Sequence, residues 1–119
     1  MSIRVMAEKD SLANKYAADA PNGTLHSSDP GTAGNATGEI SGGSPAYARK
    51  AISWSTASGT GVVTGSPTFD VASGTTVTFA GVAASSTATT NDLKDSVAVT
   101  SQAFASQGTY LVTYTYTQT

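Results

Sequence analysis

The stretch TYLVTYTYTQT, residues 109–119, places large side chains two residues apart, at Tyr110, Val112, Tyr114 and Tyr116, with threonine at most positions between them. A period of two sends successive side chains to opposite faces of a β-strand. Tyrosine and threonine both favour strands. The stretch therefore predicts a final strand with one aromatic face and one hydroxyl-bearing face.

The rest of the chain extends this pattern. Serine and threonine supply 35 of the 119 residues. Turn signals separate short alternating runs about every 8–12 residues, a spacing typical of antiparallel sandwiches and jelly rolls. We therefore expect an all-β fold, an antiparallel β-sandwich of jelly-roll type, with one N-terminal α-helix. The expected strands are 24–27, 46–55, 60–65, 67–71, 73–83, a segment around 97–99, and 109–119. The Ser-Gly turn that opens 73–83 predicts a hairpin there, with Val77 and Phe79 facing inward.

The material for a hydrophobic core is scarce. Leucine, isoleucine, valine and phenylalanine total 19 residues, and alanine alone supplies another 19. The net charge is only −2, so the composition does not match that of a disordered chain. We expect one folded domain with a small core that a partner chain helps to stabilise.

A helix is expected near the N-terminus. Asp10 or Ser11 offers an N-cap, and a Pro-Asn-Gly triplet ends the segment. Leu12, Tyr16 and Ala20 then recur on one helical face. This stripe either covers one end or edge of the sheet or docks on a neighbouring subunit.

Two parts of the chain are expected, a helical segment at 1–23 and a sandwich domain at 24–119. The sandwich domain contains a long loop at 28–45 with five glycines and two prolines. Loops of this length inside a domain are commonly functional or ordered by a partner. In the strand expected at 46–55, Ile52 and Trp54 share the face that points inward.

Composition argues against several classes of protein. The chain has no cysteine, so disulfides and thiolate metal sites are excluded. No stretch approaches the roughly 18 apolar residues of a membrane-spanning helix. The sequence is mildly acidic and has no basic stripe, which argues against nucleic-acid binding. We expect no cofactor, no membrane contact and no nucleic-acid partner.

Few residues are candidates for chemistry. His26 is the sole histidine, and we expect a surface or interface residue that hydrogen-bonds to the following loop rather than a catalytic one. Asp29, Asn35 and Glu39 supply oxygen ligands in a glycine-rich loop, but their spacing does not match a calcium loop. A glycosidase needs paired carboxylates, and the strand region between 51 and 91 offers Asp70 alone. The sequence therefore predicts a protein that is not an enzyme.

Several segments of the chain are similar to those of a known protein family. The segments TLHSSDPG (24–31), GGSPAYAR (42–49) and a following strand with Trp54 resemble a family of small virion proteins from tailed phages of actinobacteria, commonly labelled tail-fibre or minor tail proteins. SPTFDVASGTTVTFAGV (66–82) and FASQGTY (104–110) are also similar to segments of that family. The resemblance implies a virion structural protein, assembled in the bacterial host cytoplasm and displayed on the head or tail exterior.

We therefore expect a non-enzymatic capsid decoration, minor capsid or tail component whose partners are other phage virion proteins, such as major capsid or tail proteins. Symmetric self-association, expected as a trimer, would enlarge the small core. The alternative is a tail-borne adhesin that uses its tyrosine face to bind a host-surface glycan. The expected subunit-interface residues are Leu12, Tyr16, Tyr110, Tyr114 and Tyr116.

Overall fold

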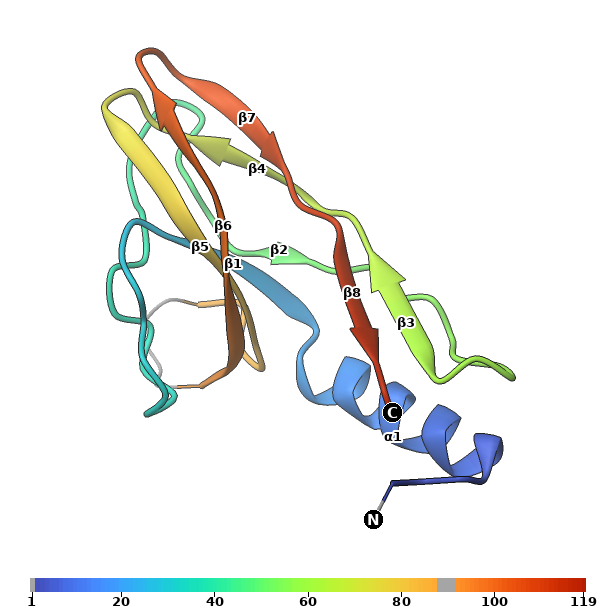
Figure 1. The fold of residues 1–119 in the computed structure, drawn as a ribbon. Helices are drawn as coiled ribbons and strands as arrows, with labels where there is room; N and C mark the ends of the chain where they lie inside the picture. The colour runs from blue at the N-terminus through green and yellow to red at the C-terminus, as the bar shows by residue number, and fades with distance from the viewer. Residues whose placement is uncertain (1, 88–91) are drawn as a thin grey trace.

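The computed structural model describes residues 2–87 and 92–119 and is mostly β with one helix (Figure 1). The pairs formed by the described strands are antiparallel, which confirms the expected fold class at that level. The elements are α1 (Met6–Asp19), β1 (Asn22–His26), β2 (Lys50–Ala51), β3 (Val62–Gly65), β4 (Thr68–Val71), β5 (Thr75–Ala83), β6 (Leu93–Phe104), β7 (Gly108–Leu111) and β8 (Tyr114–Thr117).

One layer is a four-stranded sheet in the order β2-β1-β5-β6. Leu25 of β1 pairs with Ala80 of β5, and Ala80 pairs with Val97 of β6, so these three side chains lie on the same face. Thr24 and His26 lie on the opposite face of β1, where the loop 28–45 hydrogen-bonds to the strand end. The sheet is therefore covered by chain on both faces of β1.

The other layer is a long two-stranded ribbon. β3 pairs with β8 and β4 pairs with β7 in one register, because Val62 faces Thr117 and, nine residues further on, Val71 faces Gly108. Pro67 has no N–H for the ladder, but its carbonyl accepts from the Val112 N–H at 3.1 Å, which carries the pairing across the gap. We call residues 62–71 and 108–117 together the ribbon.

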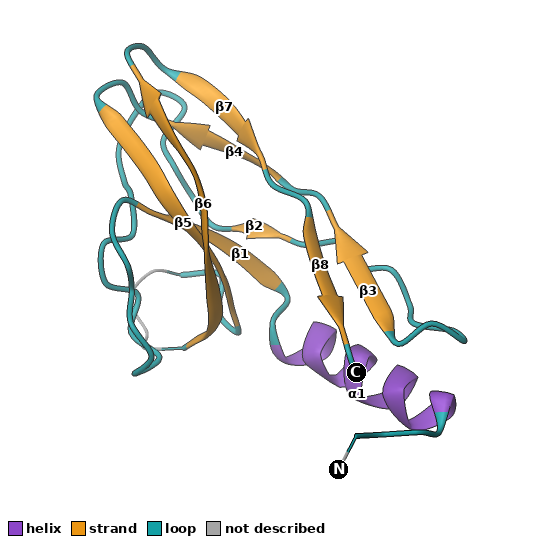
Figure 2. Cartoon of the chain, in the orientation of Figure 1, coloured by secondary structure: helices purple, strands orange, loops and turns teal. Residues whose placement is uncertain are grey.

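The ribbon runs the length of the molecule and contacts both the sheet and the helix (Figures 1 and 2). One core cluster lies between the ribbon and the sheet, and a smaller cluster lies between the ribbon and α1. The main cluster includes Leu25, Val77, Ala80, Val82, Phe69, Val71, Val112 and Tyr114. The smaller cluster is built on Ala13, Ala57 and Val63.

The alternation expected for the last strand is confirmed, but the strand is divided. Val112 and Tyr114 are buried, Tyr110 and Tyr116 are half-buried, and the threonines between them are exposed. The ladder breaks between β7 and β8, opposite Pro67, where the Ser66 and Thr113 hydroxyls lie 3.1 Å apart. A proline in one strand therefore divides its partner into two.

Other sequence predictions are wrong. The helix begins at Met6 after Val5, which makes no side-chain cap, so neither Asp10 nor Ser11 is the N-cap. Leu12 is exposed, because the ribbon packs against a neighbouring face of α1. The residues packed on that face are Ala13, Tyr16, Ala17 and Ala20.

The segment 46–55 is a strand only at Lys50–Ala51, where it pairs with β1. Ile52 is buried as expected, and Arg49, which strand alternation would place on the opposite face from Ile52, is buried as well. The turn before β5 does not form a hairpin either, because β4 pairs with β7 in the ribbon while β5 pairs with β1 and β6 in the sheet. That turn crosses from one layer to the other.

Asp10 has a different role from the one expected, since it fastens the helix to a loop. The backbone N–H groups of Gly59, Thr60 and Gly61 donate to its carboxylate at 2.7, 3.1 and 2.7 Å. The N–H groups of Gly59 and Gly61 lower the pKa of Asp10 below 3.8. Gly59 and Gly61 both have positive φ, which directs neighbouring N–H groups toward one anion.

Replacing Asp10 by alanine is expected to release this loop without unfolding the sheet, since the contact lies at the far end of the ribbon. Hydrogen exchange at Gly59, Thr60 and Gly61 should accelerate. The matched control is Asp19→Ala, which removes only an exposed pair with Lys15. Equal exchange at residues 59–61 in both variants would contradict the role assigned to Asp10.

Candidate functional site

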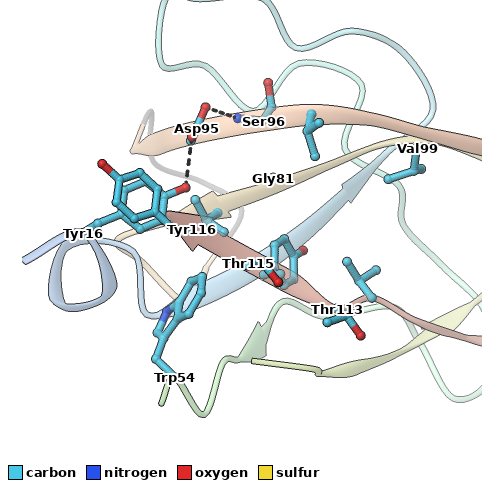
Figure 3. A pocket seen from close by; sticks show the side chains of 13 residues that line it. Tyr16, Trp54, Gly81, Asp95, Ser96, Val99, Thr113, Thr115 and Tyr116 are labelled. Carbon is cyan, nitrogen blue, oxygen red and sulfur yellow. Dashed lines mark hydrogen bonds between the residues drawn. The ribbon is translucent and has the colours of Figure 1, made fainter. Parts of the chain in front are cut away.

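A groove of about 450 Å³ lies between the sheet and the ribbon (Figure 3). β6 and β5 form one wall, residues 112–116 form the other, and α1 and Trp54 close one end. Its volume falls within the range of small-molecule sites, roughly 300–1,000 Å³. The residues used below are Tyr16, Trp54, Asp95, Val97, Tyr114 and Tyr116. We call this feature the groove.

The groove exists because the ribbon is narrower than the sheet. Val97 lies on the same sheet face as the fully buried Ala80, yet 59% of its surface is exposed. Val99, two residues further along β6, is only partly buried and packs against the core cluster. The apolar face of the sheet is therefore open along β6.

Aromatic rings form the closed end of the groove. The rings of Tyr16 and Tyr116 stack with centroids 3.9 Å apart, and Trp54 meets Tyr16 edge-on at 6.0 Å. The Tyr16 hydroxyl donates to Asp95 at 3.0 Å, and the Trp54 indole N–H donates to the Ala20 carbonyl at 2.8 Å. Burial, followed by the Asp95 charge, raises the pKa of Tyr16, so its hydroxyl stays protonated and remains a donor.

Four of the five predicted interface residues lie near the groove or at the opposite end of the ribbon. Tyr16, Tyr114 and Tyr116 line the groove, although Tyr114 is only 7% exposed and belongs mainly to the core. Tyr110 lies at the other end of the ribbon, against the Phe104 ring at 6.2 Å. Leu12 lies outside the groove on the exposed side of α1. Their contact with another subunit stays a prediction.

The outer edge of β6 is a second open feature beside the groove. β6 is 12 residues long and pairs with β5 alone among the described strands. It contains no proline, and after Asp95 it has no charged residue. Natural edge strands are usually protected by such residues, although the register shifts of β6 against β5 interrupt its regularity. The Leu93 N–H already donates to the Gly34 carbonyl at 3.1 Å and the Ser96 N–H to the Asp95 carboxylate at 2.9 Å, so the part of the edge that can accept an additional strand begins after Ser96.

A buried ion cluster, which the sequence analysis missed, ties two loops together. The side chains of Arg49 and Glu39 are 1% and 6% exposed. The Arg49 guanidinium donates to Glu39 at 2.9 Å, to Asp92 at 3.1 Å and to the Ser85 carbonyl at 3.0 Å. Tyr47 donates to Glu39 at 2.7 Å. The only sequence signal was that Glu39 and Arg49 are the two charges in the otherwise uncharged stretch 30–49.

His26 makes the expected bond to the loop, but it is not a surface residue. It is fully buried, with Nδ1 3.0 Å from the Thr37 carbonyl and Nε2 2.8 Å from the Thr24 hydroxyl. The carbonyl can only accept, so Nδ1 carries the proton and Nε2 accepts from Thr24. Burial lowers the pKa of His26 below 6.5, which keeps the ring neutral.

This burial predicts a pH dependence of stability. The folded-state pKa of His26 lies below its unfolded value of 6.5, so the unfolded chain binds more protons between those two values. Stability is full above pH 6.5 and falls as the pH drops toward the folded-state pKa. The urea midpoint should be lower at about pH 5.5 than at about pH 7.5. His26→Gln should reduce this difference, and an unchanged difference would contradict the assignment.

The oxygen ligands considered for calcium are not brought together. Asp29 accepts from the Gly31 N–H at 2.8 Å in a local turn, and Glu39 belongs to the ion cluster. No group of three or more acidic, histidine or cysteine side chains that could hold a metal lies within residues 2–87 and 92–119. The helix that the structure describes is not long and apolar enough to cross a membrane.

Comparisons of the chain with protein-family models, curated proteins and solved structures give no match.

Proposed function

We propose that this protein is a non-enzymatic structural subunit that stabilises a larger assembly through contacts made at the groove and the β6 edge. The observation that supports this most is Val97, an apolar side chain on the core face of the sheet that the chain itself leaves largely open. Burying such a side chain gains about 1.5–3 kcal/mol relative to leaving it exposed. A neighbouring subunit that covers it would therefore be favoured.

The prediction of a β-sandwich of jelly-roll type forms part of the same proposal. The sheet and the ribbon act as the two layers of a small β-sandwich of jelly-roll type, in which the ribbon is an incomplete second layer. A neighbouring chain supplies the missing width. This arrangement fits a self-associating protein, with a trimer as the expected state, because closed symmetry covers the same open edge on every copy.

The resemblance of residues 24–55 to small phage virion proteins supports the exterior of a phage particle as the location. The partners are then the major capsid or tail proteins. Mass spectrometry of purified particles of the encoding phage should detect the chain at a fixed copy number relative to the major capsid protein. Hundreds of copies would indicate the capsid surface and a few would indicate the tail. Absence from purified particles would contradict the proposal.

A second candidate function rests on the lining of the groove. Tyr16, Trp54 and Tyr116 present aromatic rings beside the Asp95 carboxylate, a mixture that suits a sugar ring (Figure 3). A tail-borne adhesin would then bind a host-surface glycan here. Under this alternative, Trp54→Ala abolishes binding to a glycan array. Under the structural proposal, the chain binds no glycan and the same variant weakens assembly.

A further inference from the structure

The residues before α1 have the pattern of a strand without a partner strand. We call residues 2–5 the arm. Ile3 and Val5 lie two apart with Arg4 between them, and the backbone of Val5 is extended, with φ −92° and ψ 118°. Val5 is 64% exposed, although a valine in a small domain is normally buried. Ile3 is half-buried, so the apolar surface that the rest of this chain leaves uncovered is mainly that of Val5.

The groove and the β6 edge offer what the arm lacks. Beyond Ser96 the edge can pair with an extended segment, and the groove beside it has an apolar floor at Val97 and Val99. An added strand on β6 would send alternate side chains toward the groove. Ile3 and Val5 are alternate residues, so both can enter the groove together.

Charge also favours this pairing. Arg4 makes no hydrogen bond or ion pair with the described residues, and Asp95, at the aromatic end of the groove, has no cationic partner among them. With Ile3 and Val5 in the groove, Arg4 faces the other side of the added strand, so its attraction to Asp95 acts at a distance, within the Debye length of about 8 Å at physiological salt. The charged residues of β6, Lys94 and Asp95, both lie at its start, so the arm meets no charge of the strand beside Val97 and Val99.

The arm cannot fill the groove of its own chain. Met6 and Tyr16 are ten residues apart on one helix, which separates them by about 15 Å along its axis. The arm has four residues, and a fully extended arm spans at most about 14 Å. Tyr16 stands at the near end of the groove, and the wall formed by Val97 and Val99 lies beyond it. The arm that reaches this wall must therefore come from another chain.

We propose that the arm of one copy adds to the free edge of β6 in a second copy and places Ile3 and Val5 in its groove. This inference rests on the proposed role of the groove as a subunit contact and specifies what fills it. Each copy both donates an arm and accepts one, so the exchange closes either as a reciprocal pair or as a ring.

The absence of native cysteine allows a direct test by disulfide trapping. A chain carrying Val5→Cys is mixed with a chain carrying Val97→Cys under mild oxidation, and cross-linked dimers are scored on a non-reducing gel. The matched control replaces Val97→Cys by Leu111→Cys, since Leu111 is comparably exposed at 63% but lies outside the groove. We expect cross-linking with Val97→Cys at least ten-fold above the control. Equal yields would overturn the inference.

Solution mass separates failure of this inference from failure of the proposed function. Deletion of residues 2–5 and the substitution Val97→Lys should each give a monomer that keeps the β circular dichroism of the parent chain. Mixing the two should restore association, because one supplies arms and the other supplies grooves. If the chain lacking residues 2–5 still associates while the Val97→Lys chain does not, the proposed arm contact is overturned and the groove contact stands. If the unaltered chain is monomeric, both are overturned.

Discussion

Replacing Arg49 by alanine is expected to lower the free energy of unfolding by about 3–5 kcal/mol, as is typical when one partner of a buried ion pair is removed. Glu39 and Asp92 would then remain with their charges in a site from which water is largely excluded. The Ser85 carbonyl would also lose its bond from Arg49. A loss of this size is a large fraction of the stability of a small domain, about 5–15 kcal/mol.

Urea denaturation of the purified chain measures this effect, and two variants calibrate it. Arg49→Lys keeps the charge but cannot reach Glu39, Asp92 and Ser85 at once, so its loss should lie between zero and that of Arg49→Ala. Lys15→Ala breaks only the exposed pair with Asp19, and its effect should be at most about 0.5 kcal/mol. If Arg49→Ala costs no more than Lys15→Ala, the cluster does not hold the two loops.

Replacing Phe69 by alanine is expected to cost about 3–5 kcal/mol, the range for a large aromatic in a packed core. Phe69 is fully buried in the ribbon, and its ring lies over Gly23 of β1, where even a Cβ atom would come within 2.9 Å. The ring also lies 6.2 Å from that of Tyr47. Its removal leaves a cavity at the place where the ribbon meets the sheet.

Phe79→Ala is the matched control, because it deletes the same atoms from a half-buried position on β5. Its cost should be clearly smaller. Thermal and urea unfolding of both variants would show the difference. Similar losses in the two variants would contradict the assignment of the ribbon–sheet contact as the centre of the core.

Local sequence patterns predicted where the strands lie better than which strands pair with one another. The runs 60–65 and 67–71 lie close to β3 and β4, and the alternation from Tyr110 to Tyr116 gave the buried face of the ribbon correctly. Both depend only on the period of two. Which strands pair depends on contacts between distant residues, and so the hairpin expected before β5 is instead a crossing from β4 to β5.

The candidate site was less predictable for the same reason. Tyr16, Tyr114 and Tyr116 were singled out by their spacing, but nothing local showed that the ribbon would be two strands wide and leave Val97 open. Arg49 was missed because its neighbours in sequence alternate as in a strand, while its charge partners are 10 and 43 residues away. Charged groups that pair across such distances leave little trace in a single sequence.

The central claim is that one chain leaves the apolar face of its sheet unfinished and that another chain completes it. Sedimentation equilibrium of the purified protein over a wide range of concentration tests this most directly. We expect a closed oligomer at micromolar concentration, dissociating on dilution and shifted to monomer by Val97→Lys. A chain that remains monomeric at the highest concentrations, with Val97→Lys equally stable, would contradict the claim.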